Sequence, residues 1–372
     1  MPLTAANSSA RRERGVPAVA GAGPDEQLDR TMKKITVTSI DVAKRAGVSQ
    51  SAVSRAFSKV PTRSGVADAT REKILRAANE LGYRPNALAR SLITQRSRIV
   101  GVLFSYLDNP FYANALELLC HGLQAQGYHA LVFMMPDTVH DVEATVSDIL
   151  QYQVDGLITA SVELSSKICE DCRERGVPVV MLNRIQDDPR LSSVTTDNVG
   201  GGRLAARALI DSGHCRIGLI AGWEGASTSR DREFGFIAEL NARSASIFTR
   251  AAGHFDLRRT EQATHDLFDR PPEDRPDGLF VANDYMAVRV MDVLRYELGL
   301  RVPDDVSVIG FDDTAMAALP TYDLTTVRQP VTQMTDAALR VLFERIDNPQ
   351  AEPEHVILGA KLVERRSVRI RT

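Results

Sequence analysis

Four cysteines and the lack of long apolar runs limit the classes of protein to which this 372-residue chain can belong. So few cysteines in a chain of this length do not suggest a disulfide framework, which fits a reducing cytoplasm. No apolar run approaches the ~20 residues that a membrane-spanning helix needs. Residues 2–23 are rich in alanine, glycine and arginine and lack the apolar centre of a signal peptide. We therefore expect a cytoplasmic protein without membrane segments.

Sequence motifs of common enzymes are also missing. The chain has no Walker phosphate loop, dinucleotide fingerprint or nucleophile elbow. Glycines 200–202 follow Asp197 and Asn198 at a predicted helix start, where close packing is the better explanation. Cys169 and Cys172 lie on a predicted helix without the second ligand pair of a metal site, so we interpret them as ordinary helix residues. We expect no metal, no cofactor and no enzymatic activity.

Charge divides the chain into a basic and an acidic part. The 45 Lys+Arg and 48 Asp+Glu residues give a net charge of −3. Counted by region, residues 32–98 have a net charge of +10 and residues 99–372 a net charge of −13. A cluster of positive charge attracts nucleic-acid phosphates, whereas an acidic surface repels them. Contact with nucleic acid is therefore expected only within the basic part.

Residues 36–57, TVTSIDVAKRAGVSQSAVSRAF, contain two short helical patterns separated by a four-residue break. We expect Gly47 to take the positive φ of a tight turn and Ser49 to cap the second helix. A plain helical hairpin would have the same periodicity, but the positive charge favours a helix-turn-helix. Its second helix would then direct Gln50, Ser51 and Arg55 toward DNA bases. The expected buried faces consist of Val42, Ala43 and Ala46, and of Val53, Ala56 and Phe57.

A third helix is predicted from about Asp68 to Leu81, capped by Asp68 or Thr70 and ended by Gly82. Its expected buried face consists of Ile74, Leu75, Ala78 and Leu81. Three short helices form only a small core, so we expect this head to be marginally stable alone.

Residues 84–92 predict a short helix after Pro85, capped by Asn86 and carrying Leu88 and Leu92 on one face. A helix of about two turns is unstable by itself in water, so it should fold only on pairing and on contact with DNA. An apolar wedge beside arginines is typical of minor-groove intercalation.

The run VTSIDVAKRAGVSQSAVSRAF, then TREKIL and ELGYRPNALARSL, resembles the lactose-repressor (LacI/GalR) family of bacterial transcription factors. The likeness continues through DNPFY, VDGLI, TTDNVGGGRLAARALIDSGHCRIGLIAG, RDREFGF, VAND, VIGFDD and LTTVRQP, and covers residues 36–366 in order. It implies a repressor that binds near-palindromic double-stranded DNA as a homodimer and responds to a small-molecule effector. The DNA contacts that it implies are Ser49, Gln50, Ser51, Arg55, Asn86, Ala89 and Leu92.

Two features of the head bear on the DNA contacts that the resemblance implies. Arg55 suits bidentate contact with guanine, although a solvated or phosphate-bound arginine is the alternative. Phe57-Ser58-Lys59 replaces the leucine-asparagine-glycine run that members usually have, and the following loop is longer. The phosphate contacts that this loop normally makes are therefore in doubt.

Beyond residue 98, apolar strand patterns alternate with helical ones, which indicates an α/β body with parallel sheets behind the all-α head. The resemblance implies two subdomains like those of a periplasmic binding protein, roughly 99–196 with 328–350 and 197–326 with 351–372. The remaining predicted parts are a disordered extension (1–34), the helix-turn-helix domain (35–83) and a hinge helix with linker (84–98). The strand candidates are Ile99–Phe104, Ala130–Met134, Gly156–Thr159, Val177–Leu182, Ile217–Ala221, Gly278–Ala282 and Val306–Phe311.

Several predicted strands end in polar residues, among them Asn183-Arg184 and Asp312-Asp313, and ligands of α/β proteins bind at the carboxyl ends of strands. The resemblance places Arg232, Asp312, Asn283 and Gln329 among the effector contacts. Phe111 would supply an apolar wall, and Trp223 a second one. The alternatives are that Asp312 caps a helix and that Trp223 lies in the core. This set suits a sugar, a sugar acid or a nucleobase.

Two further interpretations concern assembly and the competing function. No leucine heptad pattern follows the last strand pattern, so a dimer is expected rather than a tetramer. The main alternative function is a solute-binding protein without a DNA-binding role. The basic head and the missing signal peptide argue against it. Met32 is a second possible translation start.

Overall fold

The computed structural model describes residues 37–57, 66–84, 96–135, 139–160, 164–186, 188 and 190–370. It divides at Asn86 into two compact units, a small head and a large body, each of which is described by itself. None of the helices that the structure describes is long and apolar enough to cross a membrane.

The head consists of three helices, α1 (Ser39–Ala46), α2 (Gln50–Ala56) and α3 (Asp68–Leu81). Helix α1 starts with a capping box, in which the Thr38 amide donates to the Asp41 carboxylate over 2.9 Å. That bond lowers the pKa of Asp41. Gly47 ends α1 with φ of 60°, and the Ser49 hydroxyl accepts from the Ala52 amide over 3.2 Å at the start of α2. Both predictions for the turn are confirmed.

Small residues dominate the core of the head. Val42, Val53 and Ile74 are fully buried, one on each helix, and alanines fill the space between them. Two details of α3 differ from expectation. Leu75 is 37% exposed because it lies one residue, or about 100°, beyond Ile74, so Ala77 takes the inward position. Within the described part of the head, no side chain caps α3, since Asp68 is already its first helical residue. Gly82 ends the helix as predicted, with φ of 67°.

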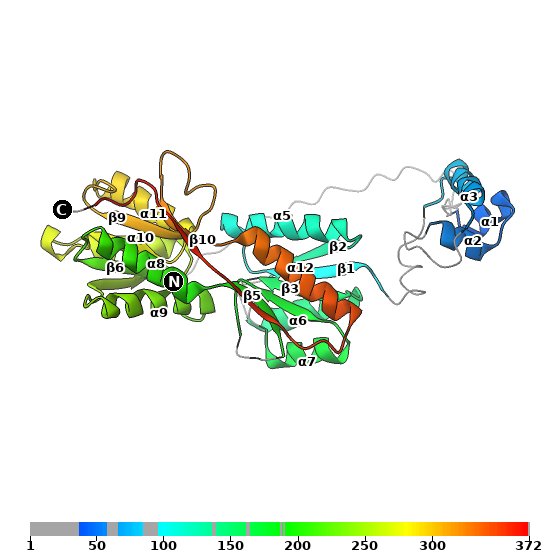
Figure 1. Ribbon diagram of the computed structural model, residues 1–372, viewed down its shortest axis with the longest axis horizontal. Helices are drawn as coiled ribbons and strands as arrows, with labels where there is room; N and C mark the ends of the chain where they lie inside the picture. The colour runs from blue at the N-terminus through cyan, green and yellow to red at the C-terminus, as the bar shows by residue number, and fades with distance from the viewer. Residues whose placement is uncertain are drawn as a thin grey trace, which may run out of the picture. The chain divides into compact units, whose positions relative to one another are not determined.

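The first sheet of the body has the strand order β11-β5-β4-β3-β1-β2, with every neighbouring pair parallel. Helices α5 (Pro110–Ala125) and α12 (Val331–Asp347) cover one face, and α6 (Val139–Gln151) and α7 (Ser166–Glu174) cover the other (Figure 1). We call this layered unit the first subdomain. Its strands are β1 (Ile99–Phe104), β2 (His129–Met134), β3 (Gly156–Ala160), β4 (Val179–Leu182), β5 (Ser192–Thr196) and β11 (His355–Leu358).

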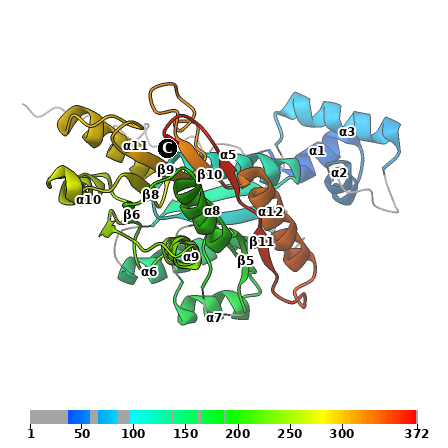
Figure 2. The same cartoon turned by 60° about the vertical axis from the view of Figure 1, so that its left-hand side comes forward.

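The second sheet has the order β12-β10-β9-β8-β6-β7 and is parallel except for β12, which runs antiparallel to β10. Helices α8 (Asn198–Asp211) and α9 (Ser227–Ala242) cover one face of this second subdomain, and α10 (Leu257–Phe268) and α11 (Asp284–Asp292) cover the other (Figure 2). Short helical turns at Pro272–Asp274 and Val293–Glu297 complete it. Its strands are β6 (Ile217–Ala221), β7 (Thr249–Ala252), β8 (Gly278–Val281), β9 (Ser307–Asp312), β10 (Thr325–Arg328) and β12 (Lys361–Val363).

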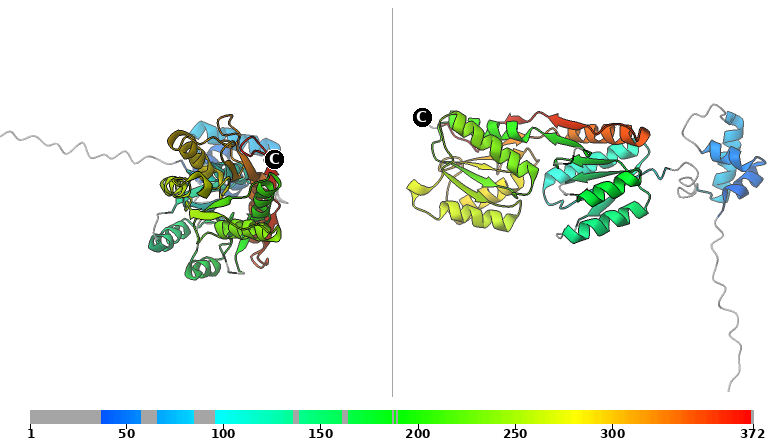
Figure 3. Two further views of the ribbon diagram at one scale, coloured as in Figure 1. Left: turned by 90° about the vertical axis from the view of Figure 1, so that its left-hand side faces the viewer. Right: turned by 90° about the horizontal axis from the view of Figure 1, so that it is seen from below.

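The chain passes between the subdomains after β5, after β10 and after β11, along one side of the body (Figure 3). The α/β fold class is confirmed, and each predicted apolar stretch contains a strand. The predicted subdomain ends need correction. Residues 351–358 were expected in the second subdomain, but β11 pairs with β5, with His355 opposite Ser193. Strand β10, which extends to Arg328, belongs to the second sheet.

Strands β5, β7, β10, β11 and β12 were not among the strand candidates. Strand β5 reads SSVTT, and all of its residues are buried although four are polar. Their hydroxyls take part in the packing, since Ser192 Oγ accepts from the amide of Glu354 over 3.2 Å. A strand without apolar alternation gives no periodic signal, which explains the omission of β5.

Candidate functional sites

Helix α2 presents a polar surface on the side away from Val53 and Ala56. Ser49, Gln50, Ser51 and Arg55 are all exposed. The Gln50 amide donates to Ser39 Oγ over 3.0 Å, and the hydroxyls of Ser49 and Ser51 lie 2.9 Å apart. Short polar side chains near the start of α2 and a long cation in its last turn are suited to contact base edges and phosphates.

The predicted hinge contacts Asn86, Ala89 and Leu92 lie outside the described residues. For these three positions the interpretation stays a prediction.

In the body, Asp312 at the end of β9 joins the two subdomains. Its carboxylate accepts from Gln329 Nε2 over 2.7 Å, and Gln329 directly follows β10 on the passage to α12. The other oxygen accepts from Asn109 Nδ2 over 3.3 Å, and Asn109 caps α5 of the first subdomain. Arg232 Nη1 lies 3.5 Å from the same carboxylate oxygen that accepts from Gln329. Asp312 therefore does not act as a helix cap, because its partners are side chains from three other segments.

Close packing of α8 against α9 positions Arg232. A side chain at Gly202 would overlap the Arg232 carbonyl group, so only glycine permits this approach. Arg232 Nε can then donate to Asn198 Oδ1 over 2.9 Å, and Nη1 to the Ala282 carbonyl over 2.6 Å. The guanidinium also lies 3.7 Å above the ring of Phe311. These contacts confirm the packing role predicted for the glycines.

Burial dominates the electrostatics of this ion pair. Desolvation raises the pKa of Asp312, opposed by Arg232 and by the donors Gln329 and Asn109. Desolvation likewise lowers the pKa of Arg232, opposed by Asp312. Removal of one partner from such a buried pair typically costs about 3–5 kcal/mol, because the other charge is left uncompensated. Arg232 and Asp312 therefore stabilise the fold, and they also provide polar groups for a ligand.

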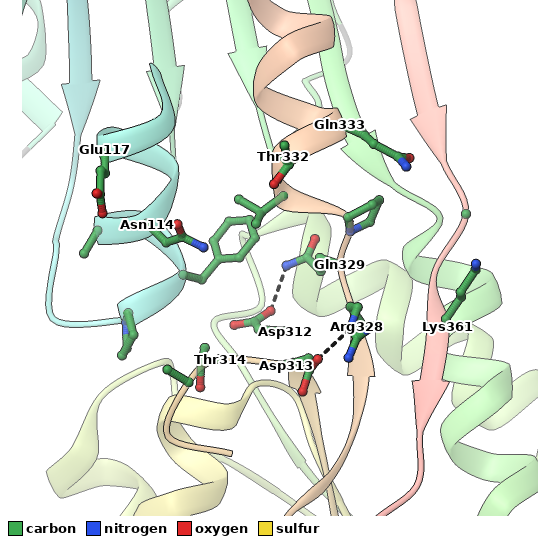
Figure 4. A pocket seen from close by; sticks show the side chains of 17 residues that line it. Asn114, Glu117, Asp312, Asp313, Thr314, Arg328, Gln329, Thr332, Gln333 and Lys361 are labelled. Atoms are coloured by element: carbon green, nitrogen blue, oxygen red, sulfur yellow. Dashed lines mark hydrogen bonds and ion pairs between the residues drawn. The ribbon is translucent and has the colours of Figure 1, made fainter. Parts of the chain in front are cut away.

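A cavity of about 830 Å³ opens between the subdomains beside Asp312 (Figure 4). It is lined by parts of 110–117, 312–315, 328–333 and 359–361, and so by both subdomains and the connections between them. Gln329 and Asp312 point toward one another in it, and Asp313 turns toward Arg328. Of the six predicted effector residues, Phe111, Asp312 and Gln329 line this cavity.

The other three predicted effector residues lie elsewhere. Arg232 is buried behind Asp312, with the contacts given above. Asn283 Oδ1 accepts from the Met286 amide over 3.0 Å, so this side chain caps α11. Trp223 follows β6 and is 42% exposed, with the Arg184 guanidinium 5.7 Å from its ring centre. The core placement considered for Trp223 is thus wrong.

Asn183 was expected at a polar strand end but was not among the predicted effector contacts. Asn183 is buried at the end of β4 and donates to the Tyr112 hydroxyl over 3.1 Å. Among the residues that the structure describes, neither Asn183 Oδ1 nor Gln329 Oε1 has a hydrogen-bond partner, although both atoms are buried. A buried acceptor without a donor is costly, and ligand-binding sites often explain such atoms. A polar residue after an apolar strand was the available signal for Asn183, but it did not distinguish this strand end from the others.

Cys169 and Cys172 face the apolar core between α7 and the first sheet. Burial raises the pKa of the Cys172 thiol to about 12. A buried thiol of this kind is chemically inert, which fits the interpretation as ordinary helix residues.

Residues 39–86 match the sequence profile of bacterial regulatory proteins of the lacI family, and residues 206–368 match a periplasmic binding protein-like domain. The chain is 31% identical over 340 residues to the probable HTH-type transcriptional repressor ExuR of Bacillus subtilis (strain 168), covering 90% of this chain and 98% of that one. The chain belongs to the LacI family. This LacI-family protein is also 33% identical over 334 residues to the repressor PurR of Pectobacterium carotovorum subsp. carotovorum, covering 88% and 96% of the two chains.

Solved structures agree with this assignment. A lac repressor dimer bound to operator and the anti-inducer ONPF matches with a TM-score of 0.79 and 28% identity, covering 90% of this chain and 99% of that one. The transcriptional regulator CelR in complex with cellobiose matches with a TM-score of 0.67 and 31% identity, covering 89% and 99%. The protein is a DNA-binding transcriptional regulator, and α1 and α2 form its helix-turn-helix.

Proposed function

We propose that this LacI-family regulator is a repressor that binds a near-palindromic operator as a homodimer and responds to a hydroxyl-rich metabolite bound between its subdomains. The curated relatives are named repressors, and a solved relative is a dimer on its operator. A protein that regulates genes must reach chromosomal DNA, so we place it in the cytoplasm. We assign it no catalytic activity.

Base recognition falls to Ser49, Gln50, Ser51 and Arg55 in this proposal. Their exposure on α2 supports the assignment, because a recognition helix must present its polar face to the major groove. One such helix covers only a half-site, which is why two copies and a near-palindrome are required. Asn86, Ala89 and Leu92 are proposed as minor-groove contacts on the sequence pattern alone.

The effector site in this proposal is the cavity beside Asp312. The observation that supports it most is that Asp312 hydrogen-bonds both subdomains, through Asn109 and Gln329. A molecule that binds there makes different contacts in different arrangements of the two subdomains. Its affinity for these arrangements therefore differs, and this difference shifts the equilibrium between them. The proposed effector contacts are Phe111, Asp312 and Gln329, which line the cavity, with Arg232 supporting Asp312. Asn283 and Trp223, which the family resemblance also implied, do not line it.

The chemistry of the site favours an uncharged sugar. The buried Oε1 atom of Gln329, which lines the cavity, needs a donor, and a sugar hydroxyl can supply one. Phe111 offers an apolar surface for the face of a sugar ring. Arg232 is already neutralised by Asp312, which disfavours a sugar acid as the partner of that arginine. The solved relative with cellobiose agrees with this class of effector.

Two measurements on the full chain test the proposal. Selection from random DNA should enrich one near-palindrome, and a protein that enriches no sequence is not an operator-binding repressor. Thermal shifts with cellobiose, D-ribose, D-glucuronate and hypoxanthine then test the effector class, since a ligand stabilises the state that it binds. We expect a shift with a neutral sugar. A shift with hypoxanthine alone would make the effector a nucleobase.

Gln329→Met tests the position of the site, because methionine keeps the shape but lacks the amide. It should abolish the sugar-induced shift. Gln262→Met, at an exposed glutamine of α10, is the matched control and should leave the shift unchanged. Loss of the shift in both variants, or in neither, would place the effector elsewhere.

A further inference from the structure

The turn that carries Asp312 has an unfavourable backbone. Asp312 and Asp313 have φ angles of 122° and 58°, a region that residues with a side chain rarely adopt. Such a conformation persists only where surrounding contacts enforce it. This backbone directs the Asp312 carboxylate between Asn109 and Gln329, so the contacts that hold the turn also determine where the carboxylate lies.

Asp284, the first residue of α11, contacts the turn directly. Its carboxyl group is completely buried. One oxygen accepts from the backbone amide of Thr314, the residue that follows the turn, over 2.8 Å. The other accepts from the Thr326 hydroxyl of β10 over 2.5 Å. A single carboxyl group thus connects α11, the turn and the strand that leads to Gln329.

The strand before the turn is shaped to receive this group. A Cβ atom at Gly310 in β9 would overlap Asp284 Oδ1, so only glycine leaves room for the carboxyl group beside the strand backbone. Asp284 is not among the residues that line the cavity. It can affect a ligand there only indirectly, through the turn and through β10, which leads to Gln329.

We propose that Asp284 is a positioning residue of the effector site, which holds the Asp312–Asp313 turn so that Asp312 faces Asn109 and Gln329. The consequence for effector binding rests on the proposed function. The consequence for the turn does not, because it concerns the unliganded protein. Asp313 holds the same turn from the other side through ion pairs with Arg328 (2.5 Å) and Arg365 (2.6 Å).

The electrostatics explain why the group can be replaced by an amide. Burial and the facing carboxylates of Asp312 and Asp313 together raise the pKa of Asp284 to about 8, although the hydrogen bonds from Thr326 and Thr314 oppose this increase. The carboxyl group is therefore largely protonated at neutral pH. An asparagine amide can replace the protonated group, since its oxygen accepts from the Thr314 amide and its NH2 group can donate to the Thr326 hydroxyl. The bond with Thr326 then runs in the opposite direction to the one that an ionised Asp284 accepts.

Crystal structures of the unliganded full-length variants test the positioning directly. In Asp284→Ala we expect the turn to relax and the Asp312 carboxylate to leave Gln329, whereas Asp284→Asn should keep both as in the wild type. An alanine variant that retains Asp312 within hydrogen-bond distance of Asn109 and Gln329 would overturn the proposal, whether or not any sugar binds. Should Asp284→Ala fail to fold, Gly310→Ala displaces the same group, and a retained Asp312 position in that variant is equally decisive.

Binding provides the second measurement, with the sugar that stabilises the wild type most among cellobiose and D-ribose as the probe. Asp284→Ala should weaken binding by about tenfold or more, as expected when the buried Thr314 amide loses its acceptor and the turn relaxes. Asp284→Asn should restore binding to near the wild-type affinity. Equal weakening in both variants would contradict the proposal. If neither sugar binds the wild type, the effector assignment fails, and the crystal structures still decide the role of Asp284.

Discussion

The head and the body place their functional groups in opposite environments. In the head, the proposed DNA contacts are exposed, and a core of valine, isoleucine and alanine only supports them. In the body, the polar groups beside the cavity are themselves buried, and Arg232 and Asp312 are each at most 5% exposed. A change to an exposed contact should alter binding and little else. A change to a buried polar group alters binding and stability together.

The largest difference is expected between two ion pairs. Arg232→Leu, which leaves Asp312 buried and uncompensated, should lower the free energy of unfolding of the body by about 3–5 kcal/mol. Arg45→Leu in the head breaks a 2.5 Å pair with Glu80 whose side chains are more than half exposed, and should cost about 0–1 kcal/mol. Denaturant unfolding measures both. Equal losses of unfolding free energy in the two variants would show that burial does not cause the difference between the two ion pairs.

The next difference depends on pH. The pKa of Asp284 is about 8 in the folded protein and near its usual value when unfolded, so the folded state binds more protons between these limits. Wild-type stability should therefore fall as pH rises from about 4 to 8. Asp284→Asn has no titrating group at this position, so its stability should not show this part of the pH dependence. Thermal melts at several pH values measure the difference, and parallel curves would contradict the assigned pKa.

Ile74→Ala tests whether the head unfolds independently of the body. Truncation of a buried isoleucine costs about 2–5 kcal/mol, which is a large fraction of the stability of so small a core. We expect operator binding to be lost while the calorimetric transition of the body stays in place. Leu119→Ala, at a fully buried leucine of α5, should lower the transition of the body instead. A body transition shifted by Ile74→Ala would mean that the two units unfold together.

Arg55→Ala should cost about 1–3 kcal/mol of binding free energy at the selected operator, with little effect on other DNA. Lys44→Ala, at an exposed lysine of α1, should weaken binding to all sequences alike and reduce the salt dependence. Gel shifts with operator and scrambled duplexes at two salt concentrations separate these effects. A uniform loss for Arg55→Ala would make it a phosphate contact.

The smallest effect concerns the turn of the helix-turn-helix. Gly47→Ala forces an alanine to adopt φ of 60° and should cost about 1 kcal/mol, although an added methyl group has room there. Gly359→Ala, with open space and no positive φ, should be close to neutral. Differential scanning calorimetry of both variants would test this. Equal shifts in melting temperature would contradict the view that the positive φ at position 47 destabilises alanine there.

The sequence by itself determined the head. Its helices are short and their contacts are local, so periodicity, the turn glycine and the cap serine predict α1 and α2 with their exposed faces. Leu75 and the uncapped start of α3 were mistaken because propensity fixes helix ends only to within a residue or two.

In the body, the apolar strands and the α/β class followed from the sequence, and so did the motif that contains Asp312. Only the tertiary structure decided which strand ends meet. Asn109, Asn183 and Asp284 follow predicted apolar strands, so the sequence marks them as polar strand ends, but it does not show that their partners are Asp312, Tyr112 and Thr314. The tertiary structure also decided that β11 joins the first sheet and that Asn283 caps a helix. These outcomes depend on pairing between distant segments and on buried polar groups finding partners, and neither leaves a periodic trace in the sequence.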